Sequence, residues 1–520
     1  MNPNQIMIYD TTLRDGTQAE GISFSVHDKI RIAEKLDAFG IHYIEGGWPG
    51  SNPKDIAFFD AAKKRKWRHA KICAFGSTCR ANAEPAADPQ IALLLAAETP
   101  TVTIVGKSWR LHAEQILGVT IEENRRMIRE SVAYLKSKGK EVMFDAEHFF
   151  DGYKDDSDQA MAAIEAAAEG GADVIVLCDT NGGAMLHEVS DITSAVVRAL
   201  RIPIGIHTHN DCELGVANAL AALRSGAVQV QGTINGYGER TGNCNLTSVI
   251  PNLQLKLGSP VVPELSRLRE LSLFVDELAN CQHNIRAPFV GSTAFTHKGG
   301  LHAHAVQKVA RSYEHIEPSE VGNHQHIIVS ELSGQSNVRA KARELGFELE
   351  KGSPNVIAIL QEVKRLEHLG YEFEAAEASF ELLIRRILGP VETFWELLEY
   401  HCTYIRSVRN MYETCEATVK LRMKNEDVYT VAEGDGPVNA LDAALRKALV
   451  PLYPSIEAVT LDDYKVRIIG SNQGTGARTR VLIDSTDHHD NWCTVGVSEN
   501  IIEASWLALV DSYEYKLRRS

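Results

Sequence analysis

The sequence predicts an α/β fold of the (β/α)8 TIM-barrel type, and two observations lead to that prediction. Short apolar runs alternate with amphipathic stretches from Ile6 to about residue 231, which is the pattern of βα units on a parallel sheet. There are eight such apolar runs, and eight strands in a segment of this length match a closed barrel of ordinary size. An open, doubly wound sheet is the alternative fold.

The expected elements can be placed along this segment. The strands are Ile6–Tyr9, Tyr43–Glu45, Lys71–Phe75, Thr101–Val105, Glu141–Phe144, Val174–Cys178, Ile204–Ile206 and Val228–Gln231. Helical periodicity predicts helices such as Val26–Phe39, Ile121–Ser137, Asp158–Glu169, His187–Leu200 and Gly215–Ser225. Several of them end at a glycine that can adopt the left-handed conformation of a helix cap, namely Gly40, Gly139, Gly170 and Gly226.

The rest of the chain predicts further domains, because a single core stops growing at roughly 250–300 residues and this chain has 520. We place the barrel at 1–270 and a mostly helical linker at 271–389. Within the linker, 286–330 is rich in His, Gly and Pro with little periodicity, and a segment of that kind usually has a functional reason. Gly389-Pro390 marks the boundary of a C-terminal α+β domain at 390–520.

The C-terminal domain contains a weak internal repeat. The pattern Ala417-Thr-Val-Lys-Leu, Thr430-Val431 and Ala440-x-x-x-Ala444-Leu445 recurs as Arg480-Val-Leu-Ile, Thr494-Val495 and Ala504-x-x-x-Ala508-Leu509. Each copy predicts a β-hairpin followed by a helix, so the domain is expected to contain two β-β-α units. Chance similarity of two such units is the alternative.

Composition and charge exclude several classes of partner. The chain is 44% hydrophobic and 24% charged, with a formal net charge of −15, which argues against nucleic acid and anionic membranes as partners. The N-terminus has no basic region, and no apolar run approaches the roughly 18 residues of a membrane span. We therefore expect a cytoplasmic protein. Nine scattered cysteines without a C-x-x-C pair predict reduced thiols, not disulfides or a zinc site.

Polar residues gather after three of the expected strands. Asp10-Thr-Thr-Leu-Arg-Asp-Gly follows the first strand, His207-Thr-His-Asn-Asp the seventh, and Asn235-Gly-Tyr-Gly-Glu-Arg-Thr-Gly-Asn the eighth. These strands become neighbours when a barrel closes, and barrel enzymes place their chemistry at the C-terminal ends of strands. The pattern therefore predicts one shared site.

A divalent metal is the expected occupant of that site. His207 and His209 are two residues apart, so both side chains point to one face of an extended segment. Asp15 and Asn243 would add oxygen ligands, and such a mixed set suits Mg²⁺, Mn²⁺ or Zn²⁺. A structural pair is the alternative for an isolated H-x-H, but the accompanying strand ends favour metal binding.

Other motifs suggest roles around the metal. Arg14 precedes Asp15 and could stabilise an oxyanion, with a structural salt bridge as the alternative. Glu147, after the fifth strand, could act as an acid or base. The glycines of 236–242 lack the G-x-G-x-x-G spacing and are interpreted as hinges. The loop at 470–476 could be an anion-binding nest or a plain flexible loop.

Taken together, the motifs after strands one, seven and eight resemble the barrel metalloenzymes that make or break carbon bonds to acyl-CoA enolates. That family includes 2-isopropylmalate, homocitrate and citramalate synthases and 3-hydroxy-3-methylglutaryl-CoA lyase. Residues 291–330 and the C-terminal repeat resemble the linker and regulatory domain of the synthases, which the lyases lack. Gly16-Thr-Gln-Ala-Glu-Gly and Glu45-Gly-Gly-Trp-Pro are similar to one branch of the citramalate synthases.

The resemblance implies roles for individual residues. It implies that Asp15, His207 and His209 bind the metal, that Asn243 completes the site directly or through water, and that Arg14 faces the reacting carbonyl. It also implies that Thr180 holds the carboxylate of a 2-oxo acid and that Glu147 acts in proton transfer. His302 and Tyr313 are similar to a catalytic pair that the linker of a neighbouring subunit delivers, so a homodimer is expected. His297, His304, His324 and His326 are competing histidines.

The implied reaction condenses acetyl-CoA with pyruvate and water to give citramalate and CoA, a step of isoleucine biosynthesis. Mg²⁺ or Mn²⁺ is the expected metal and Zn²⁺ the alternative. A branched-chain amino acid, isoleucine or leucine, is the implied effector of the C-terminal domain. The alternatives are condensation with 2-oxoisovalerate, homocitrate synthesis and, from a different class, a non-catalytic amino-acid sensor.

Overall fold

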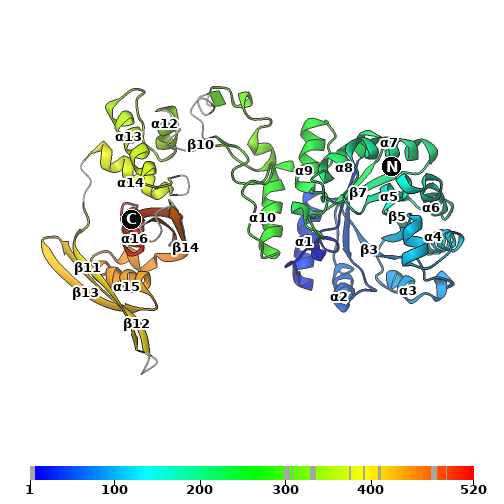
Figure 1. Ribbon diagram of the computed structural model, residues 1–520, viewed down its shortest axis with the longest axis horizontal. Coiled ribbons are helices and arrows are strands. Elements are labelled where there is room, and N and C mark those ends of the chain that lie inside the picture. Colours follow the sequence, from blue (N-terminus) through cyan, green and yellow to red (C-terminus); the bar gives the residue numbers. More distant parts are fainter. Residues whose placement is uncertain are drawn as a thin grey trace. The chain divides into compact units, whose positions relative to one another are not determined.

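The chain folds into two compact units (Figure 1), of which the first covers residues up to Phe295 together with Ile316–His324. The second comprises Thr296–His315 and Gln325–Ser520. Because the two units interleave between residues 296 and 325, the division into three domains stays a prediction. The computed structural model describes residues 6–297, 302, 305–306, 308–327, 335–373, 376–389, 393–407, 412–469, 477–487 and 489–519.

The first unit contains a closed barrel of eight parallel strands, as the sequence predicts. Strand β1 pairs with β8 in parallel, from Met7 opposite Gln229 to Asp10 opposite Gly232, so no edge remains open. This closure excludes the open doubly wound sheet. The strands are β1 (Met7–Asp10), β2 (Tyr43–Gly47), β3 (Lys71–Ser77), β4 (Thr101–Lys107), β5 (Glu141–Glu147), β6 (Val174–Asp179), β7 (Ile204–Thr208) and β8 (Gln229–Gly232).

All eight strands run one to three residues further at their C-terminal ends than their apolar runs predict. Strand β5 continues from the expected Phe144 to Glu147, and β7 continues from Ile206 to Thr208. The extra residues are polar or small because this end of the barrel holds the side chains described below. Glu147 and His207 therefore lie on strands, which position a side chain more rigidly than loops do.

Helices surround the barrel, and their ends follow local capping rules. Helix α1 begins with a capping box between Ser25 and Asp28 and ends at Gly40, with φ +100°. Gly139 and Gly226 also adopt positive φ, as expected, but Gly170 is right-handed and the following Gly171 takes the left-handed position. The helices are α1 (Val26–Phe39), α2 (Pro53–Ala62), α3 (Pro89–Ala96), α4 (Ile121–Ser137), α5 (Phe149–Asp155), α6 (Ser157–Glu169), α7 (Leu186–Ala199), α8 (Gly215–Arg224), α9 (Leu246–Pro251) and α10 (Leu268–Leu278).

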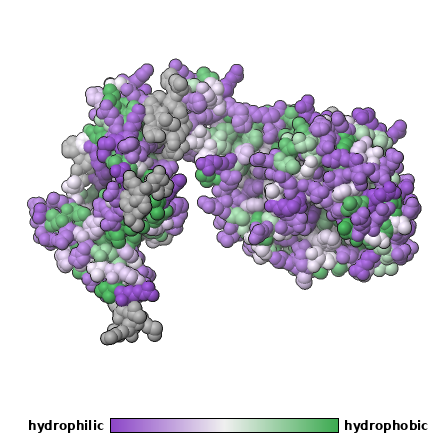
Figure 2. Space-filling view, in the orientation of Figure 1, coloured by the Kyte–Doolittle hydropathy of each residue, from purple (hydrophilic) through white to green (hydrophobic). Residues whose placement is uncertain are grey.

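Side chains fill the barrel, so it is a core and not a pore. Its interior holds an apolar layer that includes Tyr9, Tyr43, Met143 and Val176. All nine cysteines lie in the described part of the chain and are free thiols, as predicted. Among the described residues there is no helix long and apolar enough to cross a membrane. Hydrophilic residues cover most of the barrel unit on the face shown in Figure 2.

The second unit begins with irregular structure and short helices. Strands β9 (Thr296–His297) and β10 (His326–Ile327) pair in parallel. Three helices follow, α12 (Gln335–Glu344), α13 (Pro354–His368) and α14 (Glu377–Leu388). These three helices agree with the mostly helical linker that the sequence predicts.

The C-terminal part consists of two similar units, each with one strand more than predicted. The first contains β11 (Glu396–Ser407), β12 (Tyr412–Met423), β13 (Glu426–Gly434) and α15 (Pro437–Leu449). The second contains β14 (Thr460–Ile469), β15 (Arg478–Thr486), β16 (Asn491–Ser498) and α16 (Ile501–Leu517). The predicted hairpins are β12–β13 and β15–β16, and β11 and β14 are added at the sheet edges.

The repeat extends to matched hydrogen bonds. Thr430 Oγ1 donates to the Ala444 carbonyl and Thr494 Oγ1 to the Ala508 carbonyl, each over 2.8 Å. In both units a strand hydroxyl therefore ties the sheet to its helix at an equivalent position, which favours a repeat over chance similarity. The loop at 470–476, considered above as an anion nest, lies outside the described residues.

Candidate active site

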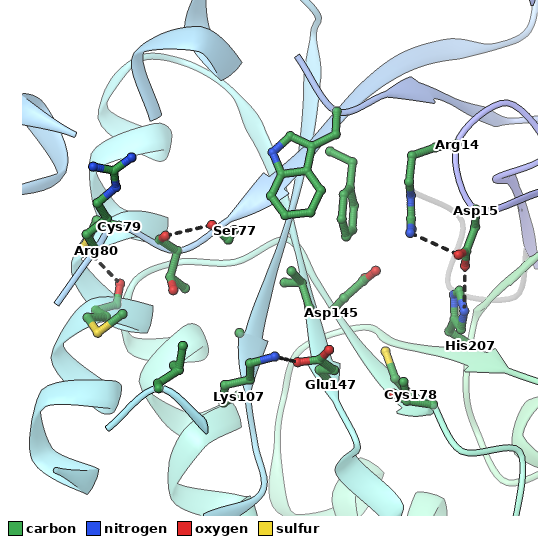
Figure 3. A pocket seen from close by; sticks show the side chains of 18 of the residues that line it. Arg14, Asp15, Ser77, Cys79, Arg80, Lys107, Asp145, Glu147, Cys178 and His207 are labelled. Atoms are coloured by element: carbon green, nitrogen blue, oxygen red, sulfur yellow. Dashed lines mark hydrogen bonds and ion pairs between the residues drawn. The ribbon is translucent and has the colours of Figure 1, made fainter. Parts of the chain in front are cut away.

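Three side chains at the C-terminal end of the barrel form a candidate metal centre. His207 Nε2 lies 3.3 Å from Asp15 Oδ2 and 3.3 Å from His209 Nε2, and Figure 3 shows Asp15 and His207 facing one another. The ligand atoms all lie within 4.8 Å of one another, and all three residues are buried. Throughout the described part of the chain, this is the one group of three such side chains that could hold an ion.

The turn after β1 places Asp15 there. Its amide donates to Thr11 Oγ1 over 3.3 Å, and the Gly16 amide donates to the Thr11 carbonyl over 3.0 Å. Thr12 Oγ1 accepts the Ile234 amide over 2.9 Å, which ties the ends of β1 and β8 together. The sequence therefore brings Asp15 to β7 because strands β1, β8 and β7 are adjacent.

Asn243 reaches the same place through a tight loop after β8. Its backbone forms an isolated bridge with His209. Gly236, Gly238 and Gly242 all adopt positive φ, which confirms their interpretation as hinges. A Cβ at Gly238 would lie 2.1 Å from Asn243 Nδ2, so the loop requires glycine at this position.

The donor set fits a divalent cation. One carboxylate and two imidazoles converge, and two buried atoms beside them, His209 Nδ1 and Asn243 Oδ1, have no hydrogen-bond partner among the described residues. Buried polar atoms are rarely left unpaired without a reason such as an ion or a water molecule. A site of this kind requires neutral imidazoles and an ionised carboxylate.

Electrostatics favour those protonation states for two of the ligands. Burial, together with the neighbouring His207, lowers the pKa of His209 to about 3. Burial opposes ionisation of Asp15, but the charge of Arg14 and the hydrogen bond from His207 outweigh it and hold the pKa of Asp15 well below its usual range. For His207 the effect of burial is outweighed by Asp15, and its pKa is raised. Below its raised pKa, a proton therefore competes with a cation for His207.

Arg14 is fixed beside this centre by a residue that sequence reasoning missed. Its Nε donates to Glu45 Oε1 over 2.6 Å, and one terminal nitrogen lies 3.2 Å from Asp15 Oδ1. Glu45, on β2, is fully buried and also accepts from Tyr9 Oη over 2.6 Å and Thr11 Oγ1 over 2.5 Å. The guanidinium stacks 3.8 Å from the centroid of Phe75. Arg14 thus presents its cationic edge in one orientation.

The centre opens into a cavity of about 550 Å³. Glu147 and Thr180, both predicted site residues, line it, and Glu147 forms an ion pair with Lys107 (Figure 3). Thr180 Oγ1 accepts the His148 amide over 2.9 Å, so its hydroxyl hydrogen can be donated to a ligand. Phe75 and Val105 also line the cavity, whereas Ile104, next to Val105 on β4, is packed in the core.

His302 and Tyr313 belong to the second compact unit. Their rings stack with centroids 4.3 Å apart, so the predicted pair is adjacent, and Tyr313 is 51% exposed. His297 Nε2 lies 3.1 Å from Glu314 Oε1, an ion-pair contact that favours a structural role for this histidine. His304, another competing histidine, lies outside the described residues.

Comparisons with known proteins agree with this arrangement. Three family models match in order, HMGL-like over residues 5–275, homocitrate synthase post-HMGL domain-like over 289–370, and LeuA allosteric (dimerisation) domain over 374–517. The (R)-citramalate synthase of Aquifex aeolicus is 54% identical to this chain, over 99% of the chain and 98% of that protein. That of Geobacter sulfurreducens is 51% identical over the same shares. The chain belongs to the citramalate synthase family.

Membership of this family confirms the resemblance predicted from the barrel motifs. A more distant relative, the 2-isopropylmalate synthase of Methanocaldococcus jannaschii, is 31% identical over 98% of this chain and 94% of that protein. The family models also account for the non-barrel half of the chain, because the match at 374–517 spans both C-terminal β-β-β-α units.

Sequence reasoning missed a network beside the metal centre, and Asp145, one member of that network, also lines the cavity. His207 Nδ1 lies 2.8 Å from Gln231 Oε1, and Gln231 Nε2 donates to Asp145 Oδ1 over 3.0 Å. Burial raises the pKa of Asp145 to about 7, against the opposing charge of His207. A signal was available, since Glu45, Asp145 and Gln231 are polar residues inside otherwise apolar strands. Along a barrel strand, side chains alternate between the barrel interior and the outer face that packs against the helices. Polar residues at alternate positions of an apolar strand are therefore expected to point into the interior.

Proposed function

We propose that this chain is a citramalate synthase that condenses acetyl-CoA with pyruvate and water to give (R)-citramalate and CoA. The observation that carries the reaction type is the buried Asp15–His207–His209 cluster beside Arg14, which lines a cavity large enough for a substrate. The choice of pyruvate is supported by the name and 54% identity of the Aquifex aeolicus relative. We place the reaction in the cytoplasm.

Asp15, His207 and His209 would bind the divalent metal, and Asn243 would complete the site directly or through water. Mg²⁺ or Mn²⁺ is the proposed ion and Zn²⁺ the alternative, because carboxylate, amide and imidazole ligands suit all three. When bound, the ion would act as a Lewis acid that polarises the ketone of the 2-oxo acid.

Arg14 would stabilise the negative charge that develops on the ketone oxygen during carbon bond formation. It is suited to this role because Glu45, Asp15 and Phe75 hold its guanidinium in place before substrate binds. Preorganised donors of this kind are worth about 3–4 kcal/mol each. Thr180 would donate its hydroxyl hydrogen to the carboxylate of the 2-oxo acid.

Glu147, His302 and Tyr313 would share the proton transfers. The methyl group of the thioester must lose a proton, and water must later attack the thioester. Glu147 reaches the cavity from β5, where Lys107 pairs with it. Glu147 and His302 are both candidate bases, and they lie in different units of the chain. We therefore assign proton removal to these three residues as a group.

We propose a homodimer in which each linker supplies His302 and Tyr313 to the partner's barrel. The match to a LeuA allosteric (dimerisation) domain supports self-association. Large apolar side chains are exposed on the C-terminal sheets, and exposed patches of this kind mark interaction surfaces. They are Leu397, Tyr404, Ile405, Tyr429, Leu461, Val466 and Ile468. A branched-chain amino acid, isoleucine or leucine, is the proposed effector of this domain.

A free-thiol assay with acetyl-CoA and a panel of 2-oxo acids tests the proposal. We expect CoA release to be fastest with pyruvate and to require a divalent metal. Preference for 2-oxoisovalerate would replace citramalate by 2-isopropylmalate as the product, and preference for 2-oxoglutarate would favour homocitrate. CoA release with none of them would support a non-catalytic sensor.

A further inference from the structure

We propose that Gln231 and Asp145 are positioning residues that hold the His207 imidazole in the tautomer competent to bind metal. The inference rests on the proposed metal site of Asp15, His207 and His209. Neither Gln231 nor Asp145 is a proposed metal ligand, and both would act on the metal through His207.

The three residues form a continuous path across the barrel interior. Gln231 lies on β8, His207 on the neighbouring β7, and Asp145 on β5. The two contacts measure 2.8 Å from His207 Nδ1 to Gln231 Oε1 and 3.0 Å from Gln231 Nε2 to Asp145 Oδ1. Their exposed fractions are 5% for His207, 0% for Gln231 and 3% for Asp145. Water therefore has little access to replace either bond.

The chemistry of each group determines the next one. Asp145 Oδ1 accepts from Gln231 Nε2, so the Gln231 amide is oriented with its NH₂ group toward β5. The amide oxygen must then face His207, and because it too only accepts, His207 Nδ1 must carry the proton. A neutral imidazole has one N–H, so the lone pair is on Nε2. Nε2 is the atom that faces Asp15 and His209.

A second buried glutamine on β8, Gln229, does not make the contacts that Gln231 makes. Gln229 is also fully buried, but its Nε2 contacts Met143 Sδ over 3.4 Å and its Oε1 has no hydrogen-bond partner among the described residues. Among the described residues, Gln229 makes no hydrogen bond to the metal cluster. It is therefore a matched control for the loss of a buried amide on β8.

The test is the dissociation constant of Mn²⁺, measured by electron paramagnetic resonance on the full chain at pH 8 without substrate. Gln231→Leu removes the acceptor for Nδ1–H and should weaken Mn²⁺ binding roughly 10–100-fold, the usual effect of losing such a partner. Gln229→Leu should leave the constant unchanged. Saturating Mn²⁺ should restore most of kcat to Gln231→Leu, with KM for the 2-oxo acid unaltered.

A variant that exchanges the carboxylate and the amide controls for the possibility that Gln231→Leu weakens binding by disturbing the fold. In the double variant Gln231→Glu/Asp145→Asn, the carboxylate moves to β8 and the amide to β5, so Nδ1 still donates to an oxygen acceptor. This variant should bind Mn²⁺ as tightly as the wild-type chain. Equal binding by wild type and Gln231→Leu would overturn the inference alone, and so would a double variant as weak as Gln231→Leu. A wild-type chain that binds no Mn²⁺ would overturn the proposed site as well.

Discussion

The barrel unit and the second unit hold their candidate catalytic side chains in opposite surroundings. In the barrel, Asp15 is 3% exposed and contacts Arg14 and His207. In the second unit, Tyr313 is 51% exposed, and the ring that stacks on it belongs to His302, itself exposed. One set is organised within a single chain before any ligand arrives, and the other is displayed on a surface. The difference indicates that metal binding and proton transfer can be broken separately.

The largest effect is expected for His207→Ala, which removes a ligand from the buried set. We expect loss of bound metal and a fall in turnover of at least about 10³-fold, because a metal contributes several kcal/mol to charge stabilisation. The far-ultraviolet circular dichroism spectrum should be unchanged, since β7 remains. Full metal content with retained turnover would contradict the assignment.

His302→Ala tests the exposed set. It should lower kcat roughly 10²–10⁴-fold, the usual contribution of a positioned acid or base, and leave metal content at the wild-type level. A loss of metal in this variant would show that the two sets are not separable. His297→Ala, which removes one partner of Glu314 and leaves Gln325 as another, is the matched control and should retain turnover.

Hybrid dimers sharpen the same comparison. When His207→Ala and His302→Ala chains are mixed and allowed to exchange subunits, a shared site would combine the intact barrel of one chain with the intact linker of the other. Half of the dimers would be hybrids with one complete site, so about a quarter of wild-type activity should return. No recovery despite verified exchange would mean that each chain completes its own site.

Glu45→Gln should have a smaller effect, through Arg14. The change removes the charge that holds Nε, so we expect kcat/KM to fall roughly 10–100-fold and stability to decrease by about 1–3 kcal/mol in urea unfolding. Glu141 is the matched control, because it also accepts from three side chains, Tyr43, Lys71 and Thr101, at the N-terminal end of the strands. Glu141→Gln should lose stability but keep turnover.

The smallest effect concerns pH. Because the pKa of His207 is raised in the metal-free chain, a cation competes with a proton there. Mn²⁺ affinity should be constant above that pKa and fall about tenfold for each pH unit below it. The lowered pKa values of Asp15 and His209 add no dependence between pH 6 and 8. Calorimetric titrations across that range measure this, and pH-independent affinity would contradict it.

The sequence predicted the barrel and the clustering of Asp15, His207 and His209 at its C-terminal end, because strand periodicity and barrel closure can be inferred from the order of apolar and polar residues. His207 and His209 follow from the two-residue period of a strand, and Asp15 follows from strand adjacency in a closed barrel. The contacts of Glu45 and Asp145 could not be predicted, since Tyr9–Glu45 and Asp145–Gln231 join residues 36 and 86 positions apart. Such pairs depend on which side chains lie at the same height inside the closed barrel, and the spacing of residues along the sequence does not give this.

The C-terminal sheets show a different limit. Strand β14 is nearly all exposed, and Thr460-Leu-Asp-Asp-Tyr-Lys lacks the alternation of buried and polar residues that identifies a strand. Backbone pairing with β15 makes it a strand all the same. The hairpin β15–β16 was predictable because Arg480-Val-Leu-Ile and Thr494-Val495 repeat the pattern of the first unit.

The central claim is that Asp15, His207 and His209 hold one divalent cation. Anomalous diffraction from crystals grown with Mn²⁺ tests it most directly. The account predicts a single strong peak within about 2.0–2.4 Å of an oxygen of Asp15 and of Nε2 of His207, with His209 in the same coordination sphere. A peak elsewhere in the barrel, or none at saturating Mn²⁺, would contradict the account.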